Sequence, residues 1–95
     1  MKRLISAICV LFFLLPLSAQ ETYQKETFIS SRGDTLQYRL LQPENMKKSE
    51  KYPLVLFLHG AGERGNDNER QLTHGGQMFL NPVNREKYPA FVLAP

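Results

Sequence analysis

Residues 53–62 read PLVLFLHGAG, in which five consecutive large apolar residues run directly into a glycine-bearing corner. An uninterrupted apolar run of this length predicts a strand buried on both faces, as in parallel sheets. In open α/β sheets, ligands bind just beyond the carboxyl ends of such strands. Glycines there let the backbone turn sharply and direct its N–H groups at a negatively charged oxygen. The stretch therefore predicts an oxyanion-binding corner and acyl-transfer chemistry.

The first 20 residues have the pattern of a secretory signal peptide. Lys2 and Arg3 form a basic start, residues 4–17 are mostly apolar, and small residues follow up to Gln20. The apolar segment is too short for a membrane anchor, because 14 residues at ~1.5 Å each cover only about 21 Å of a ~30 Å hydrocarbon core. We expect cleavage after either Ala19 or Gln20, a secreted or periplasmic mature chain in residues 21–95, and membrane contact only during export.

Cysteine usage and charge exclude several classes of function. Cys9 is the only cysteine and lies inside the apolar segment, so a processed chain has neither a disulfide nor a thiolate nucleophile. The formal net charge is +3, but without Lys2 and Arg3 it is +1, with ten basic and nine acidic residues. This balance gives no support for nucleic-acid binding. The sequence does not indicate an oligomeric state.

An antiparallel hairpin is expected ahead of the apolar run. Residues 27–30 and 35–41 are strand candidates, and apolar side chains alternate with polar ones along the second. Residues 31–34 (Ser-Arg-Gly-Asp) between them are typical of a turn. A polar connecting loop over residues 42–52 follows.

Two interior strands of a parallel sheet are expected next, at residues 54–58 and 90–94. The 31 residues that separate them are enough for a right-handed crossover that contains a helix. Capping residues 66–69 (Asn-Asp-Asn-Glu) mark the start of that helix. Its apolar stripe consists of Leu72, Phe79 and Leu80. Gly75-Gly76 interrupts the helix, and Asn81-Pro82 with Tyr88-Pro89 closes the crossover.

The processed chain, about 75 residues long, is short for a doubly wound sheet. A domain of this size is marginally stable without disulfides or bound metal ions. The final segment also has the pattern of a buried strand cut at its end. We therefore expect an α/β chain that is the N-terminal, truncated part of a longer protein. The alternative is an intact small domain that ends on a core strand.

The histidines and the oxygen-rich residues 66–69 are the candidates for a catalytic or metal-binding site. His59 is either a general base or, as we favour, an orienting residue fixed by hydrogen bonds within the corner, and His74 is an exposed helix residue. The two histidines have no third ligand, so no metal site is expected. The oxygen-rich residues 66–69 lack the ligand spacing of an EF-hand and are explained by helix capping. An ion pair between Glu63 and Arg64 would brace the loop.

Phosphate-binding and nucleophile motifs are missing from the sequence. Residues 60–65 hold three glycines but lack the Lys-Ser/Thr ending of a phosphate-binding loop, so no nucleotide is expected. Ser30, Ser31 and Ser49 lie outside any Gly-x-Ser-x-Gly context, so none is a candidate nucleophile.

The stretch PLVLFLHGAGERGNDNE, residues 53–69, resembles the third-strand region of secreted α/β-hydrolase-fold esterases. The resemblance is to the phospholipase/carboxylesterase-like group, also called predicted peptidases, near polyhydroxybutyrate depolymerases and feruloyl esterases. It is strong over residues 52–95 and looser from Phe28 onward. It implies the N-terminal part of an α/β-hydrolase sheet, with residues 90–94 as the next parallel strand.

The resemblance also implies the chemistry. The backbone N–H of Ala61 would be one oxyanion donor, Gly60 and Gly62 would shape the corner, and His59 would support it without being the triad base. The nucleophilic serine, acid and base would lie beyond residue 95, and no cofactor is implied. The expected function is serine-dependent hydrolysis of small or polymeric esters, or of peptides. The alternatives are a secreted, non-catalytic binding module and an inactive truncated product.

Overall fold

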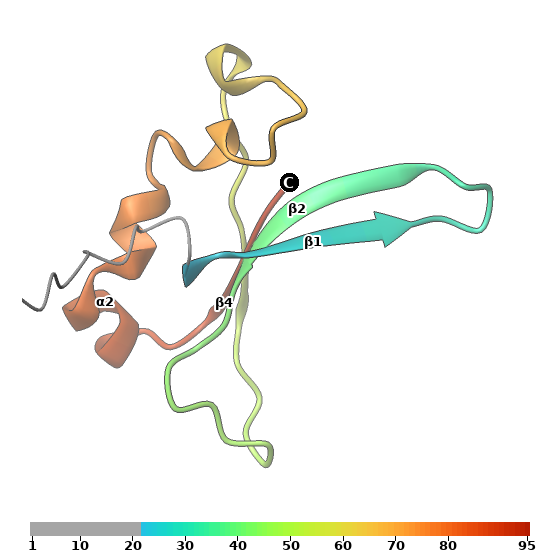
Figure 1. Ribbon diagram of the computed structural model, residues 1–95. Helices are drawn as coiled ribbons and strands as arrows, with labels where there is room; N and C mark the ends of the chain where they lie inside the picture. Colours follow the sequence, from blue (N-terminus) through green and yellow to red (C-terminus); the bar gives the residue numbers. More distant parts are fainter. Residues whose placement is uncertain (1–21) are drawn as a thin grey trace, which may run out of the picture.

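The computed structural model describes residues 22–95, which form one mixed sheet with a helical crossover (Figure 1). The predictions for the signal peptide, its cleavage and Cys9 fall outside the described residues. Within residues 22–95, no helix has both the length and the apolar composition that crossing a membrane requires.

The sheet contains four strands in the order β1-β2-β4-β3. The antiparallel hairpin consists of β1 (Gln24–Ile29) and β2 (Thr35–Leu41). Strand β4 (Phe91–Ala94) pairs antiparallel with β2 and parallel with β3 (Leu54–Leu56), so it lies inside the sheet. The expected α/β arrangement of a hairpin followed by parallel strands is therefore confirmed.

Strand β3 differs from the prediction of an interior strand buried on both faces. It lies at the edge of the four-stranded sheet and ends at Leu56, although the Phe57 N–H still donates to Leu93 O at 2.9 Å. Its alternate side chains Leu54 and Leu56 are 63% and 58% exposed. Val55 and Phe57, which point the other way, pack against the core. An apolar run shows that a strand is suited to burial, but the neighbouring chain decides which faces are covered.

The crossover is interrupted at Gly75-Gly76 as predicted, but it is built mainly of 3-10 turns and not of the α-helix that the apolar stripe predicts. It consists of three 3-10 turns, η1 (Ala61–Glu63), η2 (Arg70–Leu72) and η3 (Gly76–Leu80), and one α-helix, α2 (Pro82–Lys87). Gly75 separates η2 from η3 with a left-handed φ of 102°. The helix begins where the sequence predicted an end, because the Asn81 side chain accepts the N–H groups of Val83 and Asn84 and proline suits the first helical position.

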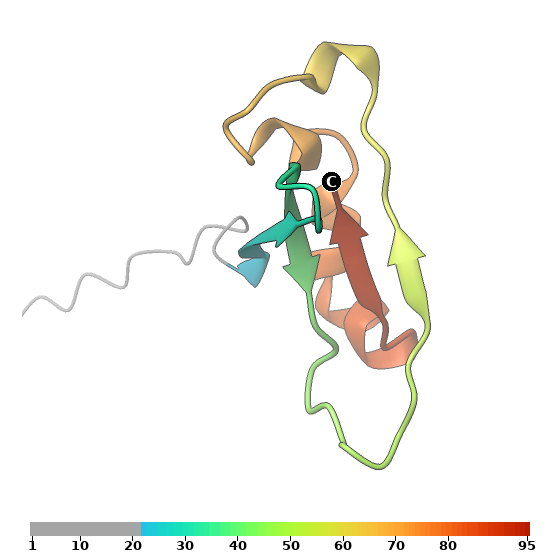
Figure 2. The same cartoon turned by 90° about the vertical axis from the view of Figure 1, so that its right-hand side faces the viewer.

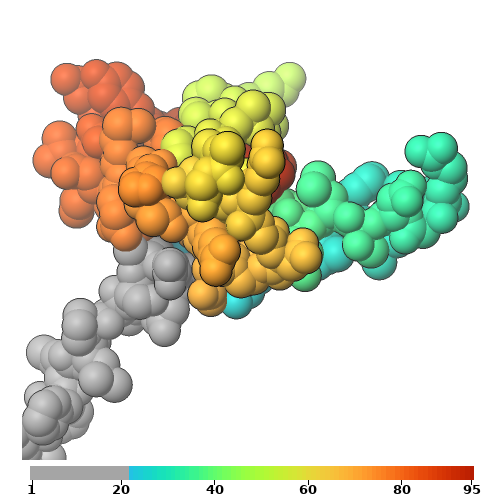
Figure 3. Space-filling model, turned by 90° about the horizontal axis from the view of Figure 1, so that it is seen from above, coloured from blue at the N-terminus to red at the C-terminus, as the bar shows by residue number. Residues whose placement is uncertain are grey.

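The core lies between the sheet and this crossover. Its buried residues are Tyr23, Leu41, Leu72, Val92 and Ala94. Phe57 and Phe79 pack beside them as an edge-to-face pair with ring centroids 5.7 Å apart. Figure 2 shows η3 and α2 behind the sheet, and Figure 3 shows the far half of the hairpin projecting from the body. The crossover thus covers one face of the sheet.

Substituting Gly75 with alanine should destabilise the fold for two reasons. A Cβ at this position would lie 2.9 Å from Cε2 of Phe57, and the φ of 102° is unfavourable for any residue with a side chain. Gly33 is the matched control, because its φ of 89° carries the same backbone cost with no atom within 4 Å of its Cβ. In urea unfolding, Gly33→Ala should cost about 1–2 kcal/mol, and Gly75→Ala should cost clearly more. Equal losses would show that the Phe57 contact does not matter.

Alkaline pH should destabilise the fold through Tyr23. Burial raises the pKa of this hydroxyl to about 12, and the nearby Arg85 guanidinium offsets part of the rise. The unfolded chain releases the same proton near pH 10. The contribution of Tyr23 to the free energy of unfolding is therefore fully present below pH 10 and is lost as the pH rises towards 12. Tyr23→Phe should remove that part of the slope and, at neutral pH, cost about 1 kcal/mol for the lost bond to Gly76 O. The exposed Tyr88→Phe is the control, and an unchanged alkaline slope in Tyr23→Phe would contradict the assignment.

Candidate functional site

The glycine-bearing corner lies beyond the carboxyl end of β3. After Phe57 leaves the sheet, the chain passes through His59 and Gly60 into the 3-10 turn η1, which the Glu63 N–H closes on Gly60 O at 3.2 Å. Figure 1 places this turn at the end of the sheet where β4 also finishes. The structure therefore brings all four predicted site residues, His59, Gly60, Ala61 and Gly62, to the carboxyl-terminal edge of the parallel pair.

The N–H of Ala61 is available as a donor. Ala61 is the first residue of η1, and the first N–H groups of a helical turn have no partner within it. Within residues 22–95, no hydrogen bond uses this N–H. Gly60, Ala61 and Gly62 are all exposed, and none of them lines either of the two cavities described below.

The two glycines of the corner have different surroundings. Gly60 has an extended φ of −83°, so its backbone conformation does not require glycine. A Cβ there would instead meet Oε2 of Glu63 at 2.9 Å. A Cβ on Gly62 would have no atom within 4 Å. A side chain at position 60 would therefore displace the Glu63 carboxylate, whereas one at position 62 would meet no atom.

Two histidines contact the corner. The Nδ1 of His59 lies 2.6 Å from Gly60 O, and since a carbonyl only accepts, Nδ1 carries the proton. The exposed His74 has its Nε2 3.2 Å from Oε1 of Glu63. Glu63 thus pairs with His74, whereas the sequence suggested Arg64 as its partner. That pairing joins two turns of the crossover, and no local spacing in the sequence indicates it.

A buried arginine links the following loop to the sheet. Arg39 of β2 is 3% exposed, and its guanidinium donates to Asn68 O at 2.6 Å and to Tyr23 O at 2.7 Å. The Asn68 side chain donates to Tyr38 O, and Gln71 donates to both Asn68 Oδ1 and Ala94 O. These bonds join the loop to β2 and to the end of β4. They were not predicted from the sequence, because Arg39 is one of the polar residues that alternate with apolar ones along residues 35–41.

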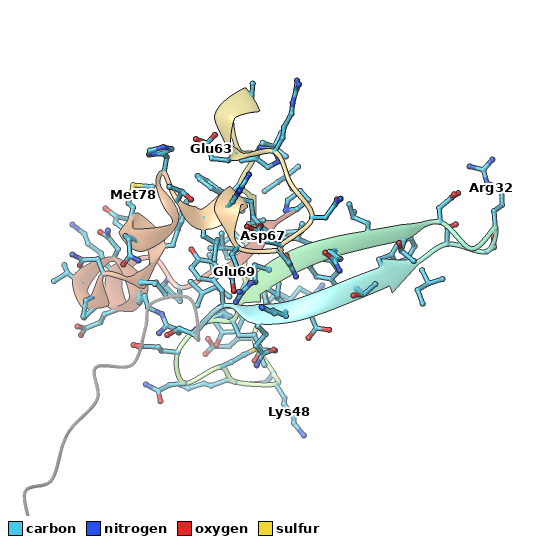
Figure 4. The ribbon with its side chains drawn as sticks, turned by 45° about the horizontal axis from the view of Figure 1, so that its top comes forward. Arg32, Lys48, Glu63, Asp67, Glu69 and Met78 are labelled. Atoms are coloured by element: carbon cyan, nitrogen blue, oxygen red, sulfur yellow. The ribbon has the colours of Figure 1, made fainter. Side chains whose placement is uncertain are left out.

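The oxygen-rich residues 66–69 act as a cap. The Asp67 carboxylate accepts the N–H groups of Arg70 and Glu69, at 3.1 Å and 3.0 Å, and these bonds lower its pKa. Figure 4 shows Asp67 and Glu69 on the loop above β2. Across residues 22–95, no three His, Cys, Asp or Glu side chains gather in a way that could hold a metal ion.

Two cavities lie near the sheet, at opposite ends. The smaller one, about 40 Å³, lies beside the corner. It is lined by Gln37, His59, Glu63, Gly65, Asn68, Gln71 and Pro95. The larger one, about 580 Å³, lies between α2 and the sheet and extends to Pro53 and Ala90, which precede β3 and β4. Ligands of α/β sheets bind at the carboxyl ends of strands, so the corner is the candidate site despite the smaller cavity.

Comparison with known proteins identifies the architecture. No protein-family model and no curated protein matches the sequence. Among solved structures, a thermostable esterase matches with a TM-score of 0.74 and 40% sequence identity. The match covers 82% of this chain and 22% of the esterase chain. The described sheet therefore matches the N-terminal part of an esterase α/β-hydrolase fold, and the resemblance to esterases inferred from residues 53–69 is confirmed.

Removing the buried guanidinium should loosen the loop that follows the corner. Arg39→Ala leaves the carbonyls of Asn68 and Tyr23 without their charged donor, which should lower the free energy of unfolding by about 3 kcal/mol. The matched control is Arg32→Ala at the exposed hairpin tip, which should change stability by less than ~0.5 kcal/mol. Urea unfolding measures both. Equal losses would contradict a structural role for Arg39.

Proposed function

We propose that this chain supplies one side of the oxyanion hole of a serine hydrolase that cleaves carboxylic esters. The observation that carries the proposal is the unpartnered Ala61 N–H at the carboxyl edge of the parallel strands. The likeness to a thermostable esterase over 82% of the chain supports it. Because the chain spans 22% of that esterase, the nucleophile, acid and base would come from outside the described residues. The pattern of residues 1–20 supports export as part of the same proposal.

The corner would act on the charge that develops during acyl transfer. A serine attacks the ester carbonyl while a histidine takes its proton, and the carbonyl oxygen becomes negative. The Ala61 N–H and the N–H that follows the serine would donate to that oxygen. Because the turn is already formed, these donors need little reorganisation in the transition state. His59 would orient the corner through its bond to Gly60 O, without taking part in proton transfer.

The direct test removes the Ala61 donor while keeping the turn. Proline suits the first position of a helical turn, and Gly60 has the extended conformation (φ −83°, ψ 177°) that a residue before proline prefers. We would graft residues 22–95 in place of the matching segment of the thermostable esterase and measure hydrolysis of a p-nitrophenyl ester. Ala61→Pro in this chimera should lower kcat by about 10²–10³-fold.

Ala61→Gly is the matched control, because it keeps the backbone N–H and should leave kcat close to that of the parent chimera. The thermal unfolding midpoint of each variant shows whether the chimera is folded. A folded Ala61→Pro chimera with the turnover of the parent would contradict the proposal. So would a folded parent chimera that does not hydrolyse the ester.

A further inference from the structure

The Glu63 side chain is unusually sequestered for a carboxylate in this region. It is 15% exposed, whereas the side chains of Asp67 and Glu69 on the neighbouring loop are 43% and 46% exposed. Its flanking residues Gly62 and Arg64 are both exposed. Figure 4 shows Glu63 at the η1 turn, at the top of the molecule. The carboxylate is therefore folded inward from a turn whose other residues face solvent.

Both carboxylate oxygens of Glu63 contact the site. Oε2 lies 2.9 Å from the position that a Cβ of Gly60 would take, and Oε1 is 3.2 Å from His74 Nε2. The backbone N–H of Glu63 also closes the turn on Gly60 O. Glu63 therefore contacts the Gly60 side of the peptide bond that carries the Ala61 N–H in two ways, through its carboxylate beside the Gly60 Cα and through its backbone N–H on Gly60 O.

His74 connects this carboxylate to the core. It lies in the short segment between Leu72, which is 5% exposed, and Gly76, whose carbonyl accepts the Tyr23 hydroxyl at 2.8 Å. The other side-chain link between the corner and the body is weaker, a 3.5 Å bond from Arg70 to Arg64 O. The Glu63–His74 pair is thus the shortest side-chain link that anchors the corner to the packed crossover.

We propose that Glu63 is a positioning residue for the oxyanion donor, with His74 as its anchor. The carboxylate fixes the Gly60–Glu63 turn so that the Ala61 N–H has one direction before substrate arrives. This inference rests on the proposed function of the corner. A carboxylate beside an oxyanion opposes the developing charge, and the His74 ring, with Nε2 3.2 Å from Oε1, offsets the charge of Glu63 only when the imidazole is protonated.

The order of the Ala61 amide measures this role directly. In the full, ¹⁵N-labelled chain, the order parameter of that amide should be about 0.8 or higher, as in a rigid backbone. Glu63→Ala and His74→Ala should each lower it to below about 0.6, because the turn loses its anchor. Glu63→Gln keeps the side-chain size and an oxygen beside His74 Nε2, so it should preserve the order. Glu44→Ala, which breaks an exposed ion pair with Arg85, is the matched control.

Each outcome decides the inference. An ordered Ala61 amide in folded Glu63→Ala and His74→Ala variants would overturn it, and so would an Ala61 amide that is already disordered in the parent. If Glu63→Ala does not fold, His74→Ala still tests the anchor, because the His74 side chain is 78% exposed. In the esterase chimera, Glu63→Ala should lower kcat more than it changes KM, and Glu63→Gln should restore most of kcat. If Ala61→Pro lowers kcat as expected but Glu63→Ala leaves kcat unchanged, this inference is refuted and the proposed function still stands.

Discussion

The buried guanidinium of Arg39 is the constraint on which the arrangement of this chain depends. Its side chain is 3% exposed, and it donates to the carbonyls of Asn68 and Tyr23. One charged group thereby holds the loop that follows the corner and the segment that precedes β1 against the same strand. A buried guanidinium without acceptors is costly, so these backbone segments must stay in place around it. Through Asn68 and Gln71 the constraint extends to the end of β4, next to the corner.

Local patterns predicted most of the fold. The turn residues between two alternating segments predicted the hairpin, and the apolar runs around residues 54–58 and 90–94 predicted the parallel pair. The errors arose where distant contacts decide. The edge position of β3 depends on strand order, which a strand's own sequence does not contain. The interruption at Gly75 was predicted, but the 3-10 turns on either side of it were not, nor was the position of Gly75 against the ring of Phe57, the residue after β3.

The site shows the same division between local and distant signals. The position of the corner at residues 59–62 was predictable, because an apolar run that ends in glycines is a contiguous signal. The anchor of that corner was not predictable, because His74 and Glu63 belong to separate turns and their contact exists only after the crossover has folded. Likewise, Arg39 meets Asn68 across 29 positions of sequence. Polar residues with buried partners look like surface residues in an alternating pattern, and nothing in that pattern predicts their burial.

The proposed chemistry requires that the Ala61 N–H binds the oxygen that becomes negative during acyl transfer. The most direct measurement is a crystal structure of the esterase chimera with a phosphonate bound covalently to its nucleophile, since the phosphoryl oxygen occupies the place of the oxyanion. We predict a distance of about 2.7–3.1 Å from the Ala61 nitrogen to that oxygen. An oxygen that is bound by other donors, with the Ala61 N–H directed into solvent, would contradict the claim.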